Sequence, residues 1–272
     1  MLCLVCESKI NYFFSKKYNK LPYSNMMQDI GEVDYYKCSN CGFTISKTHQ
    51  EIDNEKFEKL NYDFHHYLEN CETDVNQPPY LEQSMMINVL LKNQILEDDI
   101  LDYAGGYGTL SKSLKKYFDI SLPVYDPYVQ SDDFENYVEK KDLKTYKTIV
   151  TSALFEHILT REGFDEINAL VDTNGGGSLI IHTVICENVP KNPDWFYIEP
   201  PVHTTFHTNK SMSILMKQWG YEASIYCLSA KSWILLKEAS EEIKEKVENI
   251  NQEFQTEYLI YKEGFVDYWK GF

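Results

Sequence analysis

Apolar and polar positions along the chain follow two different periods, which predict helices in one part and alternating strands and helices in another. Between residues 51 and 95 apolar side chains recur at helical spacing, with Leu60 and Phe64 on one face. The segment "NQPPY" at residues 76–80 interrupts this pattern, because its two prolines disfavour a continuous helix. A second helix is expected over residues 81–91.

After residue 96 short apolar runs alternate with amphipathic stretches, which predicts a parallel sheet flanked by helices. The expected strands are 99–104, 122–127, 146–153, 176–185, 221–227 and 231–238, and the expected helices are 110–118, 161–171 and 210–220. Because the last two strands follow each other like a hairpin, we expect an antiparallel edge. The tail from residue 239 has one apolar stripe and is expected to be helical.

Composition and charge narrow the classes of protein. The chain has 272 residues, 43% of them hydrophobic, and a net charge of -16. This charge argues against a nucleic-acid surface, which needs clustered Lys and Arg. Apolar runs are too short for a membrane span, and the N-terminal segment lacks the apolar stretch of a signal peptide. We therefore expect a cytoplasmic protein.

The segment "DYAGGYGTLS" at residues 102–111 turns through glycines directly after an expected strand. In an open α/β sheet, ligands bind at the carboxyl ends of the strands. A P-loop is excluded because no lysine ends this turn, and a dinucleotide fingerprint lacks its third glycine, since Ser111 stands there. The turn therefore favours a ligand without phosphate.

Asp102, Ala104, Gly106 and Gly108 resemble the acid-x-Gly-x-Gly-x-Gly signature of class I S-adenosylmethionine-dependent methyltransferases, with Ala in place of the first glycine. Asp126 follows at the end of the next expected strand, where an acid of this family binds the ribose hydroxyls. The resemblance implies a Rossmann-like fold with a seven-stranded, mostly parallel sheet and an antiparallel edge strand. It assigns the cofactor to Asp102, Tyr103, Ala104, Gly105, Gly106, Gly108, Asp126, Pro127, Leu154, Phe155, Glu156 and His157.

Two further segments bear on this resemblance. "TSALFEHI", which contains Glu156 and His157, is similar to the family's segment after the fourth strand, and "NGGGSLIIHT" is similar to its fifth strand. The family's acid before the fourth strand is replaced by Lys147. Asp142 is then the alternative partner for the adenine amino group.

The segment "DWFYIEPPVHTTFHTNKSMSILMKQWGY" resembles methyltransferases of bacterial surface-polysaccharide gene clusters. This resemblance implies methyl transfer to an oxygen of a sugar, a nucleotide-linked sugar or a phosphoramidate precursor of a surface glycan. An alcohol acceptor needs a base to remove its proton. His203 is the candidate, with His207 and His182 in reserve. Residues 195–197 are interpreted either as a lid or sugar-stacking wall or as core.

Cys3, Cys6, Cys38 and Cys41 form two Cys-x-x-Cys pairs, a spacing typical of a structural four-cysteine zinc site. Two redox motifs are the alternative, which the terminal position of the first pair disfavours. The metal would fold a segment too small to bury its own core.

We accordingly divide the chain into a zinc ribbon (1–48), a helical linker (49–95), a methyltransferase domain (96–238) and a C-terminal helical tail (239–272). The tail helix is the candidate surface for a homodimer. Two other functions stay open: a methyltransferase of ribosomal or transfer RNA that reads RNA through its ribbon, and a cofactor-binding scaffold without activity. Cofactor binding and dependence on RNA distinguish them from an enzyme with a small-molecule acceptor.

Overall fold

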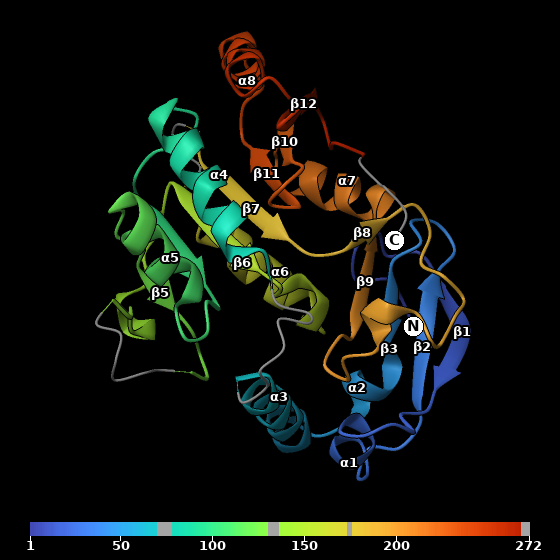
Figure 1. Cartoon of the computed structure of the whole chain (residues 1–272). Coiled ribbons are helices and arrows are strands. Elements are labelled where there is room, and N and C mark those ends of the chain that lie inside the picture. Colours follow the sequence, from blue (N-terminus) through green and yellow to red (C-terminus); the bar gives the residue numbers. More distant parts are fainter. Residues whose placement is uncertain (70–77, 130–135, 173–175, 268–272) are drawn as a thin grey trace.

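The computed structural model describes residues 1–69, 78–129, 136–172 and 176–267, in which two β-sheets are joined by helices (Figure 1). Seven described strands form the larger sheet. In spatial order they are β12 (Leu259–Glu263), β10 (Ala223–Cys227), β11 (Ser232–Leu236), β7 (Ser178–His182), β6 (Thr148–Ser152), β4 (Ile100–Tyr103) and β5 (Val124–Tyr125). The strands expected from the sequence after residue 96 are therefore confirmed, with shorter bounds.

The larger sheet ends in an antiparallel edge, as expected, but the strand at that edge is not one of the two predicted for it. β5, β4, β6 and β7 run parallel to one another, as predicted. β11, however, lies inside the sheet, antiparallel to both β7 and β10. The edge is formed by β12, which pairs antiparallel with β10. The hairpin pattern predicted the pairing of β10 with β11 but carried no information about which of them would lie inside.

Helices cover both faces of the larger sheet. On one face lie α4 (Tyr80–Lys92), α5 (Thr109–Phe118) and α8 (Glu241–Phe254), and on the other lie α6 (Arg161–Ala169) and α7 (Asn209–Gln218). Side chains alternate between the faces along each strand. In β6, Ile149 packs toward α6 and α7, whereas Val150 packs toward α4 and α5. This three-layer arrangement buries nearly continuous apolar strands, as the sequence pattern requires.

The smaller sheet combines two distant parts of the chain. In spatial order its strands are β1 (Ile10–Lys16), β2 (Val33–Cys38), β3 (Thr44–Ser46), β9 (Thr205–Thr208) and β8 (Ile185–Cys186). The strand expected over 176–185 leaves the larger sheet after His182, and Ile185 belongs to the smaller one. Residues 1–48, expected to form a ribbon, therefore share their sheet with residues 185–208.

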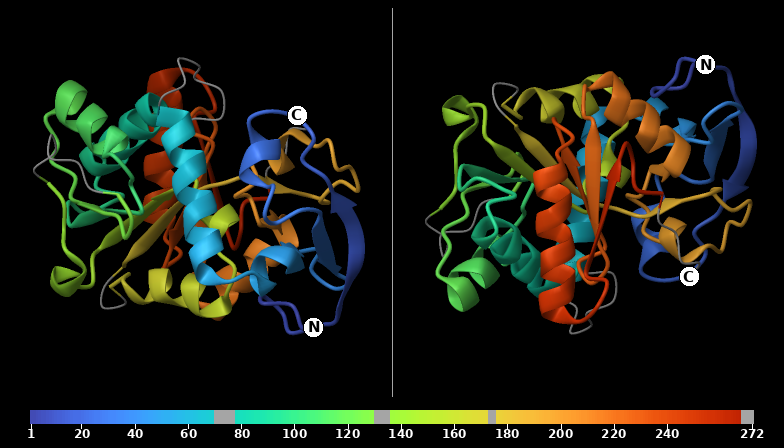
Figure 2. Two further views of the ribbon diagram at one scale, coloured as in Figure 1. Left: turned by 90° about the horizontal axis from the view of Figure 1, so that it is seen from below. Right: turned by 90° about the horizontal axis from the view of Figure 1, so that it is seen from above.

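Short helices lie near the smaller sheet and around the edges of the larger one. They are α1 (Tyr23–Met26), α2 (Lys47–Glu51), η1 (Lys140–Asp142), η2 (Phe155–His157) and η3 (Phe196–Ile198). The longer α3 (Asn54–Glu69) crosses between the two sheets (Figure 2, left). Leu60 and Phe64 of α3 are buried against the smaller sheet. The amphipathic helix expected there is confirmed.

The C-terminal tail differs from the expected helix in its last part. Residues 259–263 form β12, so the tail from residue 239 contains both a helix and a strand. Val247 and Ile250 on the apolar stripe of α8 are buried against the larger sheet of the same chain. This packing explains the stripe that suggested a dimer surface. None of the helices in the described ranges combines the length and apolar character of a membrane span.

Candidate functional site

A cavity of about 860 Å³ opens at the carboxyl ends of β4, β5 and β6 and is also bounded by α3. Its position and size suit a small ligand bound to an α/β sheet. Most of the site residues expected from the sequence contribute to its wall. They are Asp102, Tyr103, Ala104, Gly105, Gly106, Asp126, Pro127, Leu154, His157 and His203.

The glycine turn brings backbone close to the cavity. Ala104 and Gly106 both have positive φ angles, of 60° and 54°. A Cβ atom on Gly105 would lie only 2.5 Å from Oδ2 of Asp102, so a side chain has no room there. Gly108, with φ at 71°, is the N-cap of α5, and its left-handed conformation allows the helix to start at Thr109, beside the cavity. The turn therefore requires glycine for steric reasons at Gly105 and for conformational reasons at Gly106 and Gly108.

Asp102 is a buried carboxylate facing the cavity. It is 1% exposed, and its Oδ1 atom has no hydrogen-bond partner among the described residues. Burial, with a further contribution from the charge of Asp126, raises the pKa of Asp102 to about 7. A buried, unpaired carboxylate is costly, and a cationic ligand group would compensate it. The ammonium group of S-adenosylmethionine, the cofactor expected from the sequence, would supply such a cation.

Asp126 is held in a fixed orientation by backbone donors. Its Oδ2 accepts a hydrogen bond from the Gly106 amide at 2.9 Å, and its Oδ1 accepts from the amides of Tyr128 and Val129 at 2.8 Å each. Each carboxylate oxygen can accept more than one hydrogen bond. The acid expected to bind ribose hydroxyls is therefore oriented beside the glycine turn, where these hydroxyls would reach it.

Three residues expected at the cofactor lie outside the cavity wall. Gly108 acts through the start of α5, as described above. Phe155 is fully buried in the core against Phe164, with ring centroids 5.3 Å apart. Glu156 is buried and does not line the cavity, and its Oε2 accepts a hydrogen bond from the hydroxyl of Thr183 at 2.9 Å. Of the three residues of the short helix η2, only His157 lines the cavity.

Two histidines meet at the cavity wall. The rings of His157 and His203 are 5.2 Å apart in an edge-to-face arrangement. Nδ1 of His203 lies 2.7 Å from the carbonyl oxygen of Tyr197, which can only accept, so this nitrogen carries the proton. Nε2 is then the nitrogen with a free lone pair. Burial lowers the pKa of His203 to about 4, which keeps its imidazole neutral.

The reserve histidines lie elsewhere. His207 is fully buried among aromatic rings, 5.0 Å from Phe43 and 5.4 Å from Phe164. Nδ1 of His182 is bound to the carbonyl oxygen of Lys231. Neither residue is in the cavity wall. Of the three histidines considered as a base, the fold brings only His203 to the cavity.

Within residues 195–197, Trp195 and Tyr197 are core, whereas Phe196 is 44% exposed. Trp195 and Tyr197 are each 9% exposed and belong to the apolar cluster of the smaller sheet. None of the three residues lines the cavity. The hydroxyl of Tyr197 instead accepts a hydrogen bond from the Val184 amide at 3.1 Å. The interpretation of this segment as a sugar-stacking wall is therefore wrong.

Lys147 and Asp142 do not contribute to the cavity wall. Lys147 precedes β6, at the opposite end of the strand from the cavity, and pairs with Asp172 at 3.1 Å. Asp142 is exposed in η1 and is not a lining residue. Asp142 is therefore not placed to bind adenine in this structure.

No residue of α3 was assigned to the site from the sequence, although this helix forms one side of the cavity. Tyr62, His65 and His66 of this helix line the cavity, together with Tyr80 at the start of α4 and Glu166 of α6. The ring of His65 lies 5.8 Å from that of His157. The sequence signal for this side of the site was the pair His65 and His66, which lies next to the apolar stripe of the predicted helix. Only the packing of α3 between the sheets shows that they face a ligand site.

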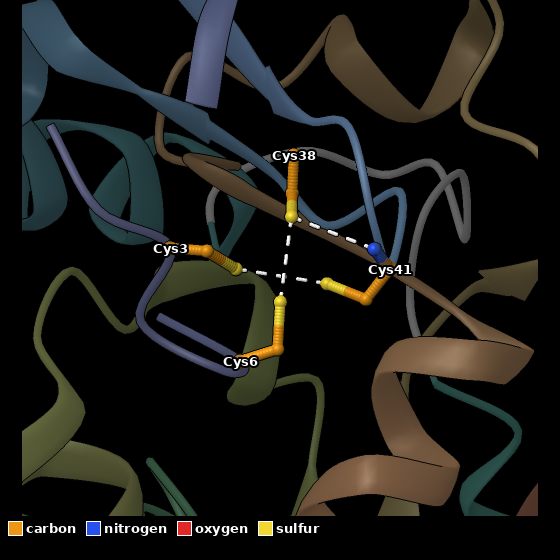
Figure 3. A group of neighbouring side chains, drawn as sticks. All are labelled: Cys3, Cys6, Cys38 and Cys41. Atoms are coloured by element: carbon orange, nitrogen blue, oxygen red, sulfur yellow. Dashed lines mark hydrogen bonds between the residues drawn. The ribbon is translucent and has the colours of Figure 1, made fainter. Parts of the chain in front are cut away.

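The four cysteines of the N-terminal pairs converge on one point (Figure 3). Sγ of Cys3 lies 3.6 Å from Sγ of Cys41, and Sγ of Cys6 lies 3.5 Å from Sγ of Cys38. Tetrahedral zinc with Zn–S bonds of about 2.3 Å separates its sulfur ligands by roughly 3.8 Å. The observed spacing is close to this value.

The surroundings of the cysteines also fit a metal. The amides of Asn40 and Cys41 donate to Sγ of Cys38, at 3.4 Å each, which orients a thiolate. The hydrogen bond between the two thiols lowers the pKa of Cys3 and raises that of Cys41, so the first thiolate of this pair forms at Cys3. The donor set of four sulfurs therefore suits zinc, which these residues would hold in a closed, structural site.

A second group of potential ligands lies at the cavity. Ligand atoms of Glu156, His157 and His203 lie within 4.8 Å of one another. Glu156 is bound to Thr183 and His203 to Tyr197, so both side chains already have partners. The four-cysteine group is the better metal site, because its atoms have the spacing of ligands around one ion.

Comparison with known proteins gives one family and a set of distant folds. A family model described as a methyltransferase domain matches residues 76–224, more than half of the chain. The magnesium protoporphyrin IX methyltransferase ChlM from Synechocystis PCC 6803, solved with bound SAH, is 13% identical with a TM-score of 0.39. That match covers 67% of this chain and 95% of ChlM. The plantazolicin methyltransferase BpumL, solved with SAH, is 13% identical to this chain with a TM-score of 0.41. That match covers 79% of this chain and 91% of BpumL. None of the curated proteins is similar in sequence to this chain.

Proposed function

The chain belongs to the methyltransferase domain family, and from this premise we propose that it transfers the methyl group of S-adenosylmethionine to an oxygen of a small polar acceptor bound beside His203. One observation carries the proposal. The glycine turn with Asp102 and Asp126 lies in the same cavity as a neutral histidine whose Nε2 has a free lone pair. The first set suits the cofactor, and the histidine suits an acceptor with a proton to lose.

The cofactor would lie along the ends of β4 and β5. Asp126 would accept hydrogen bonds from its ribose hydroxyls, and Asp102 would pair with its ammonium group. Bound there, S-adenosylmethionine supplies an electrophilic methyl group. Methyl transfer is an in-line displacement, so the main contribution of the protein is to hold the acceptor oxygen and the methyl group in line.

The acceptor would occupy the part of the cavity bounded by His157, His203 and α3. His203 would take the acceptor proton on Nε2, while Tyr197 holds its Nδ1–H and fixes the ring orientation. Following the resemblance noted in the sequence, we propose a sugar or a related precursor of a bacterial surface glycan as the acceptor class. The size of the cavity, about 860 Å³, supports a small molecule over a folded RNA as the acceptor.

The test separates chemistry from cofactor binding. His203→Ala is expected to lower turnover by roughly 10²–10⁴ while cofactor affinity stays within about twofold. Asp126→Ala is expected to affect cofactor binding instead. Calorimetry should show the binding free energy weakened by about 1–3 kcal/mol. Asp142→Ala, an exposed acid outside the cavity, is the matched control and should change neither quantity.

His203→Asn distinguishes a base from an anchor. Asparagine can donate to the Tyr197 carbonyl but cannot accept and carry away a proton at neutral pH. We expect this variant to be as slow as His203→Ala when the acceptor is screened with labelled cofactor. Turnover near that of the wild type would rule out proton transfer to His203 and direct attention to His157.

A further inference from the structure

The four-cysteine centre and His203 lie at two ends of one structural unit. Cys38 and Cys41 belong to the turn between β2 and β3, and β3 pairs with β9. His203 lies two residues before the start of β9, separated from it by Thr204. The path from the cysteines to the cavity therefore runs through a single pair of strands.

The cysteine turn rests directly on the end of β9. The hydroxyl of Thr208 donates a hydrogen bond of 2.5 Å to the carbonyl oxygen of Cys41. Gly42, with φ at 76°, packs so closely that a Cβ there would lie 3.0 Å from Cγ2 of Thr208. The cysteines themselves belong to the same apolar cluster as Phe164 and Met212 of the catalytic part. A shift of the cysteine turn would therefore displace the end of β9, because the two segments are in direct contact.

The start of β9 is held by the same sheet. The Ser46 amide donates to the carbonyl oxygen of Thr204 at 2.7 Å. The hydroxyl of Tyr35 in β2, a fully buried residue, donates to the carbonyl oxygen of His203 at 3.3 Å. These two contacts hold the carbonyl groups of His203 and Thr204, the two peptide groups that lead into β9.

The opposite side of this segment is bound to the second cavity histidine. The Thr204 amide donates to the carbonyl oxygen of Glu156 at 2.7 Å, and the Thr205 hydroxyl donates to that of Phe155 at 2.8 Å. His157 follows these residues directly. The segment 203–205 is therefore clamped between the N-terminal sheet and η2, and both cavity histidines depend on its position.

We propose that the four-cysteine centre positions the acceptor side of the cavity, so that its metal and Tyr35 govern turnover while leaving cofactor affinity unchanged. Tyr35 is a positioning residue, because it acts through the backbone of His203. The inference rests on the proposed function for the role of His203. Asp102 lies in β4, and Asp126 directly follows β5, which is an edge strand of the larger sheet. In that sheet β4 lies between β5 and β6.

A pair of variants on β2 tests the positioning role. Tyr35→Phe removes the hydroxyl that binds His203 and keeps the buried ring. Tyr36→Phe is the matched control, since Tyr36 is the next residue and packs edge-to-face on Tyr12. We expect Tyr35→Phe to lower kcat roughly three- to tenfold, the loss of one hydrogen bond. The KM for cofactor should stay within twofold, and amide exchange should accelerate in residues 203–208.

Removal of the metal from the full-length protein is the second arm. A chelator is expected to accelerate amide exchange both around Cys38–Ser46 and in residues 203–208, and to lower turnover more than tenfold. Calorimetry should find cofactor affinity within twofold. Slow exchange in residues 203–208 after metal loss, or a native protein that holds no metal, would overturn the proposal.

Two controls keep the outcomes distinct. Metal removal could unfold the whole chain and so abolish cofactor binding. In that case the comparison of Tyr35→Phe with Tyr36→Phe tests the inference. Equal amide exchange rates in residues 203–208 of these two variants would contradict it. When no acceptor is methylated by the wild type, the proposed function fails. The exchange measurements still show whether the cysteine centre and the His203 segment are coupled.

Discussion

Ala104 stands in a left-handed backbone conformation that the family pattern gives to glycine. Its φ angle is 60°, and its amide donates to the carbonyl oxygen of Tyr125 at 2.7 Å. An L-residue in this conformation costs roughly 1–2 kcal/mol. The fold tolerates this cost because the turn is fixed on both sides by hydrogen bonds. The methyl group also adds apolar surface to the cavity wall.

Ala104→Gly is therefore expected to preserve the fold and to stabilise it by up to about 1 kcal/mol, since relief of strain exceeds the entropy that glycine gains when unfolded. Chemical denaturation would measure the free energy of unfolding, and calorimetry the affinity for cofactor. Gly105→Ala is the contrasting variant, because its Cβ would lie 2.5 Å from Oδ2 of Asp102. Equal stability of the two variants would contradict this description of the turn.

Asp102 links the stability of the fold to pH. Its pKa is raised to about 7 by burial, against an ordinary value of 3.8. Between these values the folded chain retains a proton that the unfolded chain releases. The contribution of Asp102 to stability therefore falls as pH rises through this range, and the full cost is present above about pH 7.

Asp102→Asn removes this charge. At pH 8 and without cofactor we expect the variant to be more stable than the wild type by roughly 1–4 kcal/mol, and at pH 4 to be nearly equal to it. Thermal unfolding at the two pH values measures the difference, and comparison of the two proteins cancels the titration of other buried groups. Binding of S-adenosylmethionine should be lost. The same stability difference at both pH values would refute the assigned cause.

At the scale of elements, the two cysteine turns bring together four thiols that no single strand contains, and these thiols could hold a metal. Cys3 and Cys6 lie before β1, whereas Cys38 and Cys41 follow at the end of β2 and in the turn to β3. Such a site forms only when these strands pair, so metal binding and folding of the smaller sheet are linked.

We expect one zinc ion per chain in elemental analysis of the native protein. Cys6→Ser should lower the zinc content severely, because a closed site requires all four thiolates. Cys227→Ser is the control, since Cys227 is buried in β10, outside the four-cysteine group. A second ion that persists in Cys6→Ser would point to Glu156, His157 and His203. A wild type without zinc would contradict the site.

For the whole molecule, charge and the placement of the smaller sheet bear on RNA as an alternative acceptor. The net charge is -16. The first cysteine turn faces the catalytic part, where Arg161 and Gln218 donate to the carbonyl oxygens of Leu4 and Val5. Backbone groups of this turn are thus engaged within the chain. This arrangement favours a structural role for the turn over the reading of RNA.

Turnover of a small acceptor is accordingly expected to need no RNA and to vary little between 50 and 200 mM salt. A protein that contacts several phosphates loses about 10³–10⁵ in nucleic-acid affinity over this range. Filter binding with ribosomal and transfer RNA at both salt concentrations would provide the comparison. Salt-sensitive binding together with methylation that requires RNA would establish the alternative function.

The sequence alone determined those features that depend on neighbouring residues. The alternation of strands and helices after residue 96 follows from local periodicity, and the structure confirms it. The glycine turn after Asp102 could be recognised because its conformation requires particular residues at fixed spacing. The spacing within each cysteine pair marked a local ligand turn, whereas the meeting of the two turns depends on the pairing of β1 with β2.

Tertiary structure alone decided which distant segments meet. Local periodicity continues through Thr183, so the departure of the chain to the smaller sheet was not visible in it. His203 was expected near the cavity, whereas the sequence left the aromatic residues before it open between a ligand wall and core, because core and ligand walls have the same composition. The α3 side chains that complete the cavity could not be identified, since their role depends on how a helix packs between two sheets. Such contacts depend on the path of the whole chain, which no short sequence window contains.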